Sequence, residues 1–367
     1  MRLLLYRDIV ASVFFVALAF LSLFFFIDFV DELESVGKNG KTVWDAVLTT
    51  VLEMPGRLYD LFPIAVLIGT IYSLARMAQA SEFTILRTSG LGPGRALRLL
   101  AVLGAAFGLL TFVVGDYLAP ASERQSVLLK ARASGGLTLG GAGAWLKERR
   151  STPEGERNYS VNVAGANEKG ELKGIRIFEF DVDGRLLSRT QARLGRVSDE
   201  GVWTLFDAEV ARWPAAGGPG LTLVKLEKDA SMQWSSTLTA QVVSAAVLPV
   251  STMTTLELWR YSAHLSEQEQ ASQDQQIRFW RKALYPLACL VMVALALPFA
   301  YLHARSGGIS FKVFGGIMLG ISFVLLNNLS GYIGVLRGVT PWVAAATPSL
   351  LYLLMSMAAF AWLVRYR

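Results

Sequence analysis

Long apolar runs, separated by short polar stretches, dominate both ends of the chain. Six of these runs approach the roughly 20 residues that a helix needs to cross the apolar core of a bilayer. They predict six membrane-spanning helices, over Ile9–Val30, Leu61–Ala80, Ala96–Leu118, Ala283–Leu302, Val313–Ile333 and Val343–Val364. The runs form two groups of three, with a long polar region between the groups.

Apolar and polar positions alternate in much of the region between the two groups, and this period of two is typical of β-strands. The alternation predicts strands at Tyr159–Val163, Ile175–Val182, Val202–Val210, Leu221–Leu226 and Leu238–Val247. Asp183-Gly184 is a hairpin signal, and no helical period separates the strands. The segment therefore reads as an antiparallel sandwich or jelly roll, followed by a polar, helix-compatible stretch at Thr255–Gln276.

The predicted fold class is an α-helical membrane protein with six transmembrane helices in a 3+3 arrangement and an inserted all-β domain of jelly-roll type. The expected organisation is transmembrane helices 1–3 in residues 1–118, with a short cytoplasmic helix near 80–90, the β-domain in 119–255, a polar connecting helix in 256–278 and transmembrane helices 4–6 in 279–367.

Composition agrees with a membrane protein, because 53% of the residues are hydrophobic and only 17% are charged. Short loops that carry Lys and Arg tend to stay in the cytoplasm. A cytoplasmic N-terminus gathers most of these residues on the inner side: Arg2, Arg7, Arg76, Arg87, Arg95, Arg98, Arg305, Lys312, Arg365 and Arg367. Both termini are then expected in the cytoplasm, and the β-domain outside it.

Catalytic chemistry finds little support in the sequence. With Cys289 as its single cysteine and His264 and His303 as its two histidines, the chain has no intrachain disulfide and no Cys/His zinc cluster. No Gly-x-Ser-x-Gly elbow occurs. Residues 35–42, SVGKNGKT, lack the first glycine of a phosphate-binding loop. We therefore predict no catalytic residue and no metal ligand.

A polar interruption, RMAQASEFTILRTSGLGPGRALR, lies between the second and third spans. Ser81 is suited to cap a short helix, Glu82 would lie in its first turn, and Gly90 would end it. Taken alone, the segment reads as a capped connector.

Several segments together resemble one known family. They are AQASEFTILRTSGLGPGR in this loop, FFIDFVDEL after the first span, MPGRLYDLFPIAVLIG entering the second, GDYLAPASE leaving the third and ALALPFAYLHARSGGIS after the fourth. In these motifs and in its 3+3 layout the chain is similar to the LptF/LptG (YjgP/YjgQ) family of lipopolysaccharide-export permeases, and to LptG-type members more than to LptF-type ones.

The resemblance implies half of a transporter in the bacterial inner membrane, with its β-domain in the periplasm. It implies an LptF-type permease, an LptB-type ATPase dimer and an LptC-type membrane-anchored protein as partners, and lipopolysaccharide as the substrate. The chain itself would bind no cofactor and no nucleic acid, and the partner would use ATP. The first and fifth spans would form a lateral gate, and the cytoplasmic loop would dock on the ATPase through Glu82, Phe83, Leu86, Arg87 and Gly90.

Candidate substrate contacts are apolar and charged side chains at the outer ends of the first three spans: Phe26, Asp28, Asp31, Leu61, Phe62, Lys130 and Arg132. Acids near membrane depth suggest function, and Asp28 and Asp31 would contact a polar head group directly or through a divalent cation. The alternative is that they lie beyond the interface. Lys130 and Arg132 suit phosphate contact, and ordinary solvated charges fit them equally well. Some relatives are expected to carry lysines where this chain has Asp28 and Ser35.

Two other functions stay open. One is the permease of another envelope transporter, which would release lipoproteins or transmit mechanical force. The other is a membrane-anchored envelope enzyme with its active site in the β-domain, although the absence of a catalytic constellation argues against it.

Overall fold

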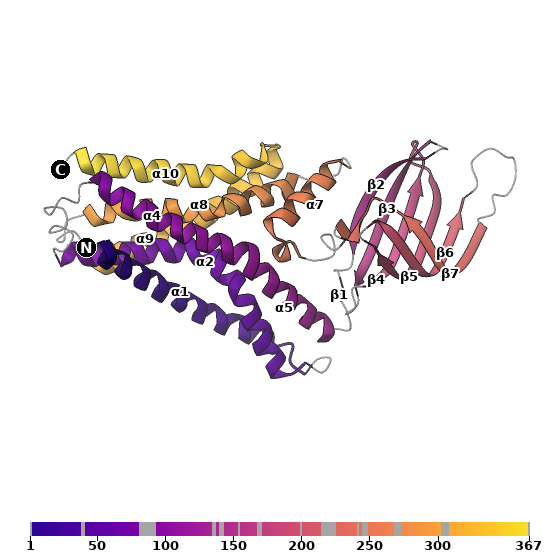
Figure 1. Cartoon of the computed structure of the whole chain (residues 1–367), viewed down its shortest axis with the longest axis horizontal. Helices are drawn as coiled ribbons and strands as arrows, with labels where there is room; N and C mark the ends of the chain where they lie inside the picture. Colours follow the sequence, from indigo (N-terminus) through magenta and orange to yellow (C-terminus); the bar gives the residue numbers. More distant parts are fainter. Residues whose placement is uncertain are drawn as a thin grey trace. The chain divides into compact units, whose positions relative to one another are not determined.

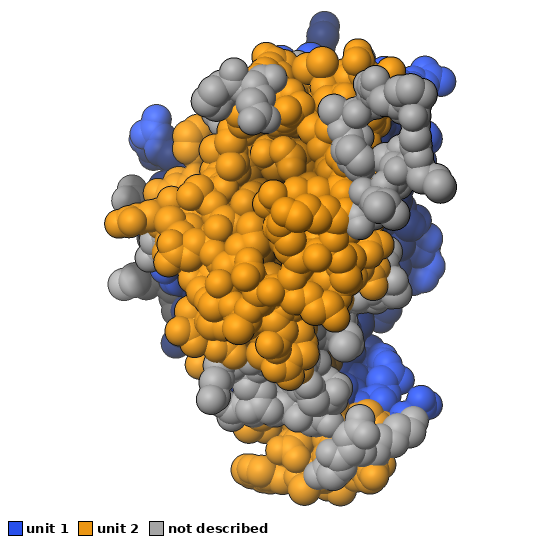
Figure 2. Space-filling view, turned by 90° about the vertical axis from the view of Figure 1, so that its right-hand side faces the viewer, with its two compact units in different colours: residues 1–34, 50–122, 273–367 blue, residues 35–49, 123–272 orange. Residues whose placement is uncertain are grey.

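The computed structural model describes residues 2–37, 41–80, 93–133, 137–138, 143–152, 155–166, 171–198, 200–213, 225–240, 242–243, 249–267, 273–301 and 308–365. The chain forms two compact units. The first consists of Met1–Glu34, Thr50–Ser122 and Gln273–Arg367, and the second of Ser35–Thr49 and Glu123–Ser272. Figure 1 shows the helices and strands, and Figure 2 colours the two units.

Six long apolar segments confirm the six predicted spans. Their helices are α1 (Arg2–Leu33), α2 (Val43–Gln79), α4 (Pro93–Val113), α8 (Gln273–Tyr301), α9 (Ile309–Arg337) and α10 (Pro341–Arg365). Each helix extends beyond its apolar run at one or both ends. Polar residues can continue a helix past the run, because its backbone N–H and C=O groups still pair with each other there.

Helix α2 departs most from its prediction, because it begins at Val43, eighteen residues before the apolar run. Its start is a capping box: the Asp45 carboxylate accepts the Thr42 backbone N–H at 2.9 Å, and the Thr42 hydroxyl accepts the Asp45 N–H at 3.2 Å. Pro55 lies inside the helix. Arg57, which lies before the predicted second span of Leu61–Ala80, therefore lies within α2.

The third span continues through a π-helical turn, η2 (Val114–Leu118), into α5 (Ala119–Ala133). The ring of Tyr59 packs against Gly115 so closely that a Cβ on this glycine would lie 2.1 Å from Cε2 of the ring. The centres of the Tyr59 and Tyr285 rings lie 4.6 Å apart, and the Tyr285 hydroxyl donates to the Asp60 carbonyl at 2.6 Å. The widened turn and the glycine together make room for a ring between α2 and the third span.

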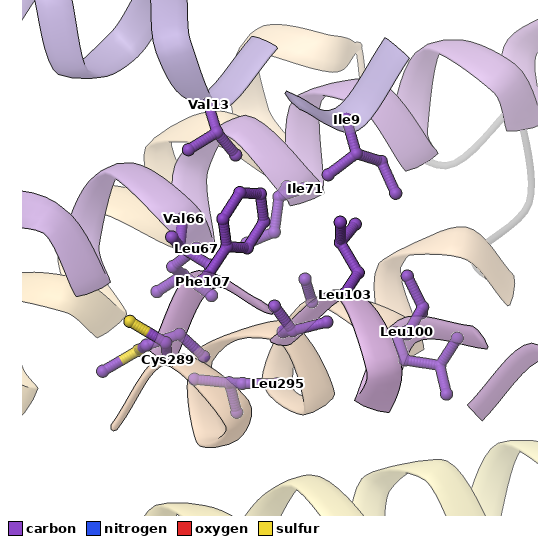
Figure 3. Close-up of a cluster of buried hydrophobic side chains, with 14 of the residues drawn as sticks. Ile9, Val13, Val66, Leu67, Ile71, Leu100, Leu103, Phe107, Cys289 and Leu295 are labelled. Carbon is purple, nitrogen blue, oxygen red and sulfur yellow. The ribbon is translucent and has the colours of Figure 1, made fainter. Parts of the chain in front are cut away.

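Helices α1, α2, α4 and α8 build most of the core of the membrane unit, to which α9 and α10 add Phe323 and Tyr352. In Figure 3, side chains from these helices point toward one another; among them are Ile9, Ile71, Leu103 and Leu295. Cys289 lies in the same cluster, where its sulfur is 3.2 Å from the Thr111 hydroxyl. Helix α2 is the most deeply packed span, with 72% of its most apolar window buried.

The second unit contains an antiparallel sheet, which confirms the predicted all-β insertion. Its strands are β1 (Leu137–Thr138), β2 (Ala144–Thr152), β3 (Gly155–Ala166), β4 (Leu172–Phe180), β5 (Leu186–Val197), β6 (Val202–Arg212) and β7 (Lys225–Ser235). From β2 to β7 each strand pairs with its neighbour in sequence, while β1 pairs with the end of β3. The described strands thus form a curved meander (Figure 1), a simpler order than the two Greek keys of a jelly roll.

Hydrogen bonds to the Glu148 side chain, rather than strand pairing, connect β2 to the segment that follows β7. The fully buried carboxylate of Glu148 accepts hydrogen bonds from the Ser236 hydroxyl at 2.6 Å, the Thr237 backbone N–H at 2.8 Å and the Arg150 guanidinium at 3.0 Å. The Arg150 guanidinium also lies over the rings of Tyr159 and Trp234. These contacts hold the curved sheet around its apolar interior.

Two details of the strand prediction were wrong. Strands β2 and β5 were not among the predicted runs, because inward-facing positions such as Glu148 and Thr190 are polar and break the apolar alternation. The described residues of 238–247 do not form a strand. Instead Leu238 is buried in the sheet interior, where its carbonyl accepts the Trp203 indole N–H at 3.0 Å. Leu238 and Val243 therefore pack into the core rather than extending the sheet.

The Asp183-Gly184 hairpin signal was correct. Gly184 has a positive φ of 78°, and its N–H donates to the Asp181 carbonyl at 3.1 Å between β4 and β5. After the sheet, η3 (Val250–Thr252) and α7 (Thr255–Glu267) complete the second unit. The predicted connecting helix of 256–278 is therefore divided between α7 and the start of α8.

Candidate functional site

The two least buried spans are α1 and α9. Only 17% of the most apolar window of α1 and 22% of that of α9 is buried, against 72% for α2. Phe14 and Phe15 on α1 are 68% and 72% exposed, and Leu336 on α9 is 84% exposed. These apolar faces are suited to lipid tails or to another membrane helix.

Both exposed helices pack on α2 through glycines. A Cβ on Gly69 of α2 would lie 2.6 Å from the Cα of Val13 on α1, so these two backbones are in direct contact. On α9, a Cβ on Gly316 would lie 2.7 Å from Ile71, and one on Gly320 would lie 3.0 Å from Ile64. Such close contacts rely on van der Waals packing, the main attraction between helices inside a membrane.

The strongest polar contact between α1 and α2 joins Asp28 to Arg57. The guanidinium donates from Nε at 2.9 Å to Oδ2 and from Nη2 at 2.8 Å to Oδ1, which is a bidentate ion pair. The Asp28 side chain is 9% exposed and that of Arg57 43%. The guanidinium carbon also lies 5.5 Å from the centre of the Phe24 ring. Both carboxylate oxygens of Asp28 are thus bound within the chain.

The sequence prediction named Asp28 but missed Arg57, which supplies the positive charge at this position. The sequence feature that could have identified this partner is the arginine in MPGRLYDLFP, which lies only four residues before the predicted start of the second span. Because an unpaired carboxylate is costly near membrane depth, an acid on one span and a base entering the next form a natural pair.

The other predicted contacts of the first two spans differ in their surroundings. Phe26 is 65% exposed and Asp31 is also exposed, so both face away from the packed core. Leu61 is half-buried. Phe62 is buried, and its ring meets that of Phe107 edge to face at 5.8 Å. The structure does not gather these residues into one pocket.

A small apolar cavity of about 40 Å³ lies beside Phe62, between α2 and the third span. Its remaining walls are Leu58, Tyr59, Leu110, Thr111 and Val114. This volume is far below that of a lipid site. It is a small packing gap next to the π-helical turn.

Lys130 and Arg132 both belong to α5, where Lys130 is half-buried. The side chain of Arg132 lies outside the described residues. In the same helix, Arg124 donates to the Thr252 carbonyl at 2.9 Å and pairs with Glu257 of α7. Burial by itself raises the pKa of Glu257, but hydrogen bonds from Arg124 and Thr254 outweigh it, and the pKa is lowered. This clasp joins the chain segments that enter and leave the β-domain.

The predicted coupling residues Glu82, Phe83, Leu86, Arg87 and Gly90 lie outside the described residues. At the border of this segment, Arg76 of α2 donates to Asp8 of α1 at 2.9 Å. Within the described ranges, no group of three or more His, Cys, Asp or Glu side chains is arranged to hold a metal ion.

Comparison with known proteins gives matches over nearly the whole chain. The chain is 28% identical over 358 residues to the lipopolysaccharide export system permease protein LptG of Haemophilus influenzae, covering 95% of this chain and 94% of that protein. It is 28% identical over 339 residues to LptG of Escherichia coli strain K12, covering 90% and 89%. The family model for the lipopolysaccharide export system permease LptF/LptG matches residues 3–365. All six spans and the β-insertion lie inside this match, and the chain belongs to the LptF/LptG family of lipopolysaccharide export system permeases.

Proposed function

We propose that this chain is a transmembrane permease subunit of an ATP-driven machine that extracts lipopolysaccharide from the outer leaflet of the bacterial inner membrane and passes it to a periplasmic bridge. The observation that carries the proposal is the family match over residues 3–365, which includes both groups of spans and the β-domain between them. Both termini lie in the cytoplasm in this proposal, and the β-domain lies in the periplasm.

Extraction needs an apolar cavity, because each methylene of an acyl chain contributes about 0.8 kcal/mol to membrane anchoring. A lipid with several chains therefore does not leave the bilayer spontaneously. The exposed apolar faces of α1 and α9 support a role as walls of such a cavity, completed by an LptF-type permease. Their glycine contacts with α2 suit helices that separate and repack, since little side-chain interlocking has to be undone.

The force in this proposal comes from an LptB-type ATPase dimer that binds the cytoplasmic loop through Glu82, Phe83, Leu86, Arg87 and Gly90. An LptC-type protein receives the lipid on the periplasmic side. The chain itself carries out no chemical step and needs no cofactor. The Arg76–Asp8 pair supports the coupling role of the loop, because it ties α2, the helix that leads into the loop, to the first turns of α1.

The experiment is purification of the tagged chain from its native host in mild detergent, followed by identification of the proteins that accompany it and by an ATPase assay. We expect a soluble ATPase and a second six-span permease to co-purify, and Glu82→Lys to lose the ATPase because it reverses the charge in the loop. Thr88→Lys, a control in the same loop, adds a positive charge without removing the acid, and we expect it to retain the ATPase.

Recovery of the chain alone, with no ATPase activity and no effect of Glu82→Lys, would overturn the proposal. Retention of the ATPase by Glu82→Lys together with its loss in Thr88→Lys would contradict the role of Glu82 alone and assign docking to another part of the loop.

A further inference from the structure

The outer face of the β-sheet carries a hollow that transport through the membrane spans does not use. Along β2, Ala144, Leu146 and Glu148 are buried, whereas Trp145, Lys147 and Arg149 are exposed. The second set therefore faces outward. Strand pairing places Ser160 opposite Lys147 and Asn158 opposite Arg149, with Phe178 and Phe180 next across β4. We call these seven outward-facing residues the outer patch: Trp145, Lys147, Arg149, Asn158, Ser160, Phe178 and Phe180.

A pocket of about 360 Å³ lies at this patch, within the size range of small-molecule sites. Its lining includes Lys147, Arg149, Asn158, Ser160, Phe180 and, from the β4–β5 hairpin, Gly184. The pocket thus combines cations, an amide, a hydroxyl and an aromatic ring. Rigid strands supply its main walls, so the groups are held in place before any ligand arrives.

Two cationic side chains, Lys147 and Arg149, line the pocket. The Arg149 Nε donates to the Asn158 side-chain oxygen at 3.3 Å, which fixes the guanidinium at the sheet surface. Glu148 also contributes to the lining, but its carboxylate is fully buried and already accepts the Arg150, Ser236 and Thr237 hydrogen bonds. Its charge is therefore neutralised on the inner side of the sheet.

The positive character continues onto the next strand. Arg189 of β5 lies opposite Phe178, and within the described part of the chain its buried Nε has no hydrogen-bond acceptor. The outward-facing acid Glu156 lies two cross-strand pairs beyond Asn158, opposite Ser151, past the end of the patch. The Arg189 guanidinium adds a cation to the outward-facing side of β5.

The aromatic side chains of the patch are placed to accept the apolar face of a ring. Trp145 and Phe178 are stacked, with ring centres 6.0 Å apart and planes 20° from parallel. Trp145 is 53% exposed although it is large and apolar. Sugar rings have an apolar C–H face that packs on aromatic rings, while their hydroxyls hydrogen-bond to groups such as Asn158 and Ser160.

We propose that the outer patch binds an acidic saccharide, a sugar chain that bears phosphate or carboxylate groups. Lys147 and Arg149 bind the anionic groups, Asn158 and Ser160 bind hydroxyls, and the aromatic side chains pack against a sugar ring. The assignment of the natural ligand rests on the proposed function, because the saccharide part of lipopolysaccharide has this chemistry. The lipid's sugars would then contact the β-domain from outside while its acyl chains leave the membrane.

The test measures binding of deacylated lipopolysaccharide to the full-length chain in detergent by isothermal titration calorimetry. Maltoheptaose serves as a neutral saccharide and inorganic phosphate as an anion without a sugar. The test variant is Lys147→Ala/Arg149→Ala. The matched control is Arg193→Ala, which removes an exposed, outward-facing arginine of the same sheet that pairs with Asp207. Circular dichroism verifies that each variant keeps its sheet.

We expect deacylated lipopolysaccharide to bind the wild-type chain and the Arg193→Ala control equally, and the double variant to bind at least about tenfold more weakly, since charge-assisted hydrogen bonds are lost. Trp145→Ala should weaken saccharide binding without changing the response to phosphate. Absent binding, equal binding of maltoheptaose, or binding unchanged in the double variant would overturn the assignment. Phosphate binding as tight as that of the saccharide would also overturn it and leave a simple anion site.

A separate measurement distinguishes this proposal from the proposed function. ATP-dependent lipopolysaccharide release by the reconstituted wild-type complex tests transport without reference to the patch. If release occurs while saccharide binding fails, only the patch proposal falls. If release does not occur while binding follows the expected pattern, the patch stands as a saccharide site and the transport proposal falls.

Discussion

Asp28 and Arg57 show how one pair of residues links two spans. The carboxylate is nearly buried while the guanidinium is about half exposed. The carboxylate therefore needs its partner charge more than the guanidinium does. Removing Arg57 leaves a carboxylate without its cation, whereas removing Asp28 leaves a cation that reaches water.

We therefore expect Arg57→Ala to destabilise the chain by about 1–3 kcal/mol, and Asp28→Asn to destabilise it less. The double variant Asp28→Asn/Arg57→Gln should recover part of the loss, because neither charge remains. Thermal unfolding of the purified variants in detergent measures this order. Equal effects of both single variants and no recovery in the double variant would contradict the unequal dependence.

Residue-level prediction from the sequence succeeded where one residue type has one strong preference. The turn at Asp183-Gly184 was foreseen because a tight hairpin needs a positive φ, which glycine adopts readily. The partner of Asp28 was not foreseen, because the apolar-run criterion placed the start of the second span after Arg57. The buried role of Glu148 was also missed, since its partners Ser236 and Thr237 are almost ninety positions away.

Among the helices, the contact between α1 and α2 depends on the small size of Gly69. A methyl group there would lie 2.6 Å from backbone atoms of Val13, which cannot move as a flexible side chain can. Gly69→Ala should push α1 away from α2 and cost about 1–3 kcal/mol. Gly94→Ala at the start of α4 is the control, since nothing lies within 4 Å of its new methyl group.

Thermal unfolding of the purified variants in detergent measures this difference. Gly69→Ala should unfold at a lower temperature than the wild type, whereas Gly94→Ala should unfold close to the wild-type temperature. Equal unfolding temperatures of the two variants would show that α1 does not rest on α2 as described.

The clasp between α5 and α7 gives a pH dependence with a definite sign. Because the pKa of Glu257 is lowered in the folded chain, the clasp stabilises the fold above the ordinary glutamate pKa of 4.5. This contribution is lost as the pH falls through the lower pKa of the folded state. Hydrogen exchange in 255–267 should therefore speed up more between pH 6 and pH 3, after correction for intrinsic rates, in the wild type than in Glu257→Gln. Equal acceleration in the two proteins would rule out the clasp as the cause.

At the level of elements, the sequence predicted what hydrophobic length and period determine. Six apolar runs became six spans, because the backbone must form helices wherever water is absent. The first half of α2 was missed because its Pro55 and charged residues conceal a helix that begins with a capping box. In the β-domain, 238–247 has strand-like alternation, yet its described residues Leu238 and Val243 pack into the core, so tertiary contacts such as the Trp203 hydrogen bond outweighed local propensity.

The whole molecule consists of a membrane unit and a β-unit, each with its own apolar cluster. The predicted substrate contacts belong to both: Phe26, Asp28, Asp31, Leu61 and Phe62 to the first, and Lys130 and Arg132 to the second. Single-chain patterns predicted the class and the number of spans. They could not identify how a lipid is held, because in the proposed function the cavity is completed by a second permease.

The most direct test of this function is ATP-dependent release of lipopolysaccharide from proteoliposomes that contain this chain, its co-purifying permease and the ATPase, with a soluble periplasmic acceptor outside. The proposed function predicts transfer to the acceptor that requires ATP hydrolysis and stops when this chain is omitted or carries Glu82→Lys. Transfer that continues without this chain, or ATP hydrolysis by the complete complex with all lipopolysaccharide retained in the membrane, would contradict it.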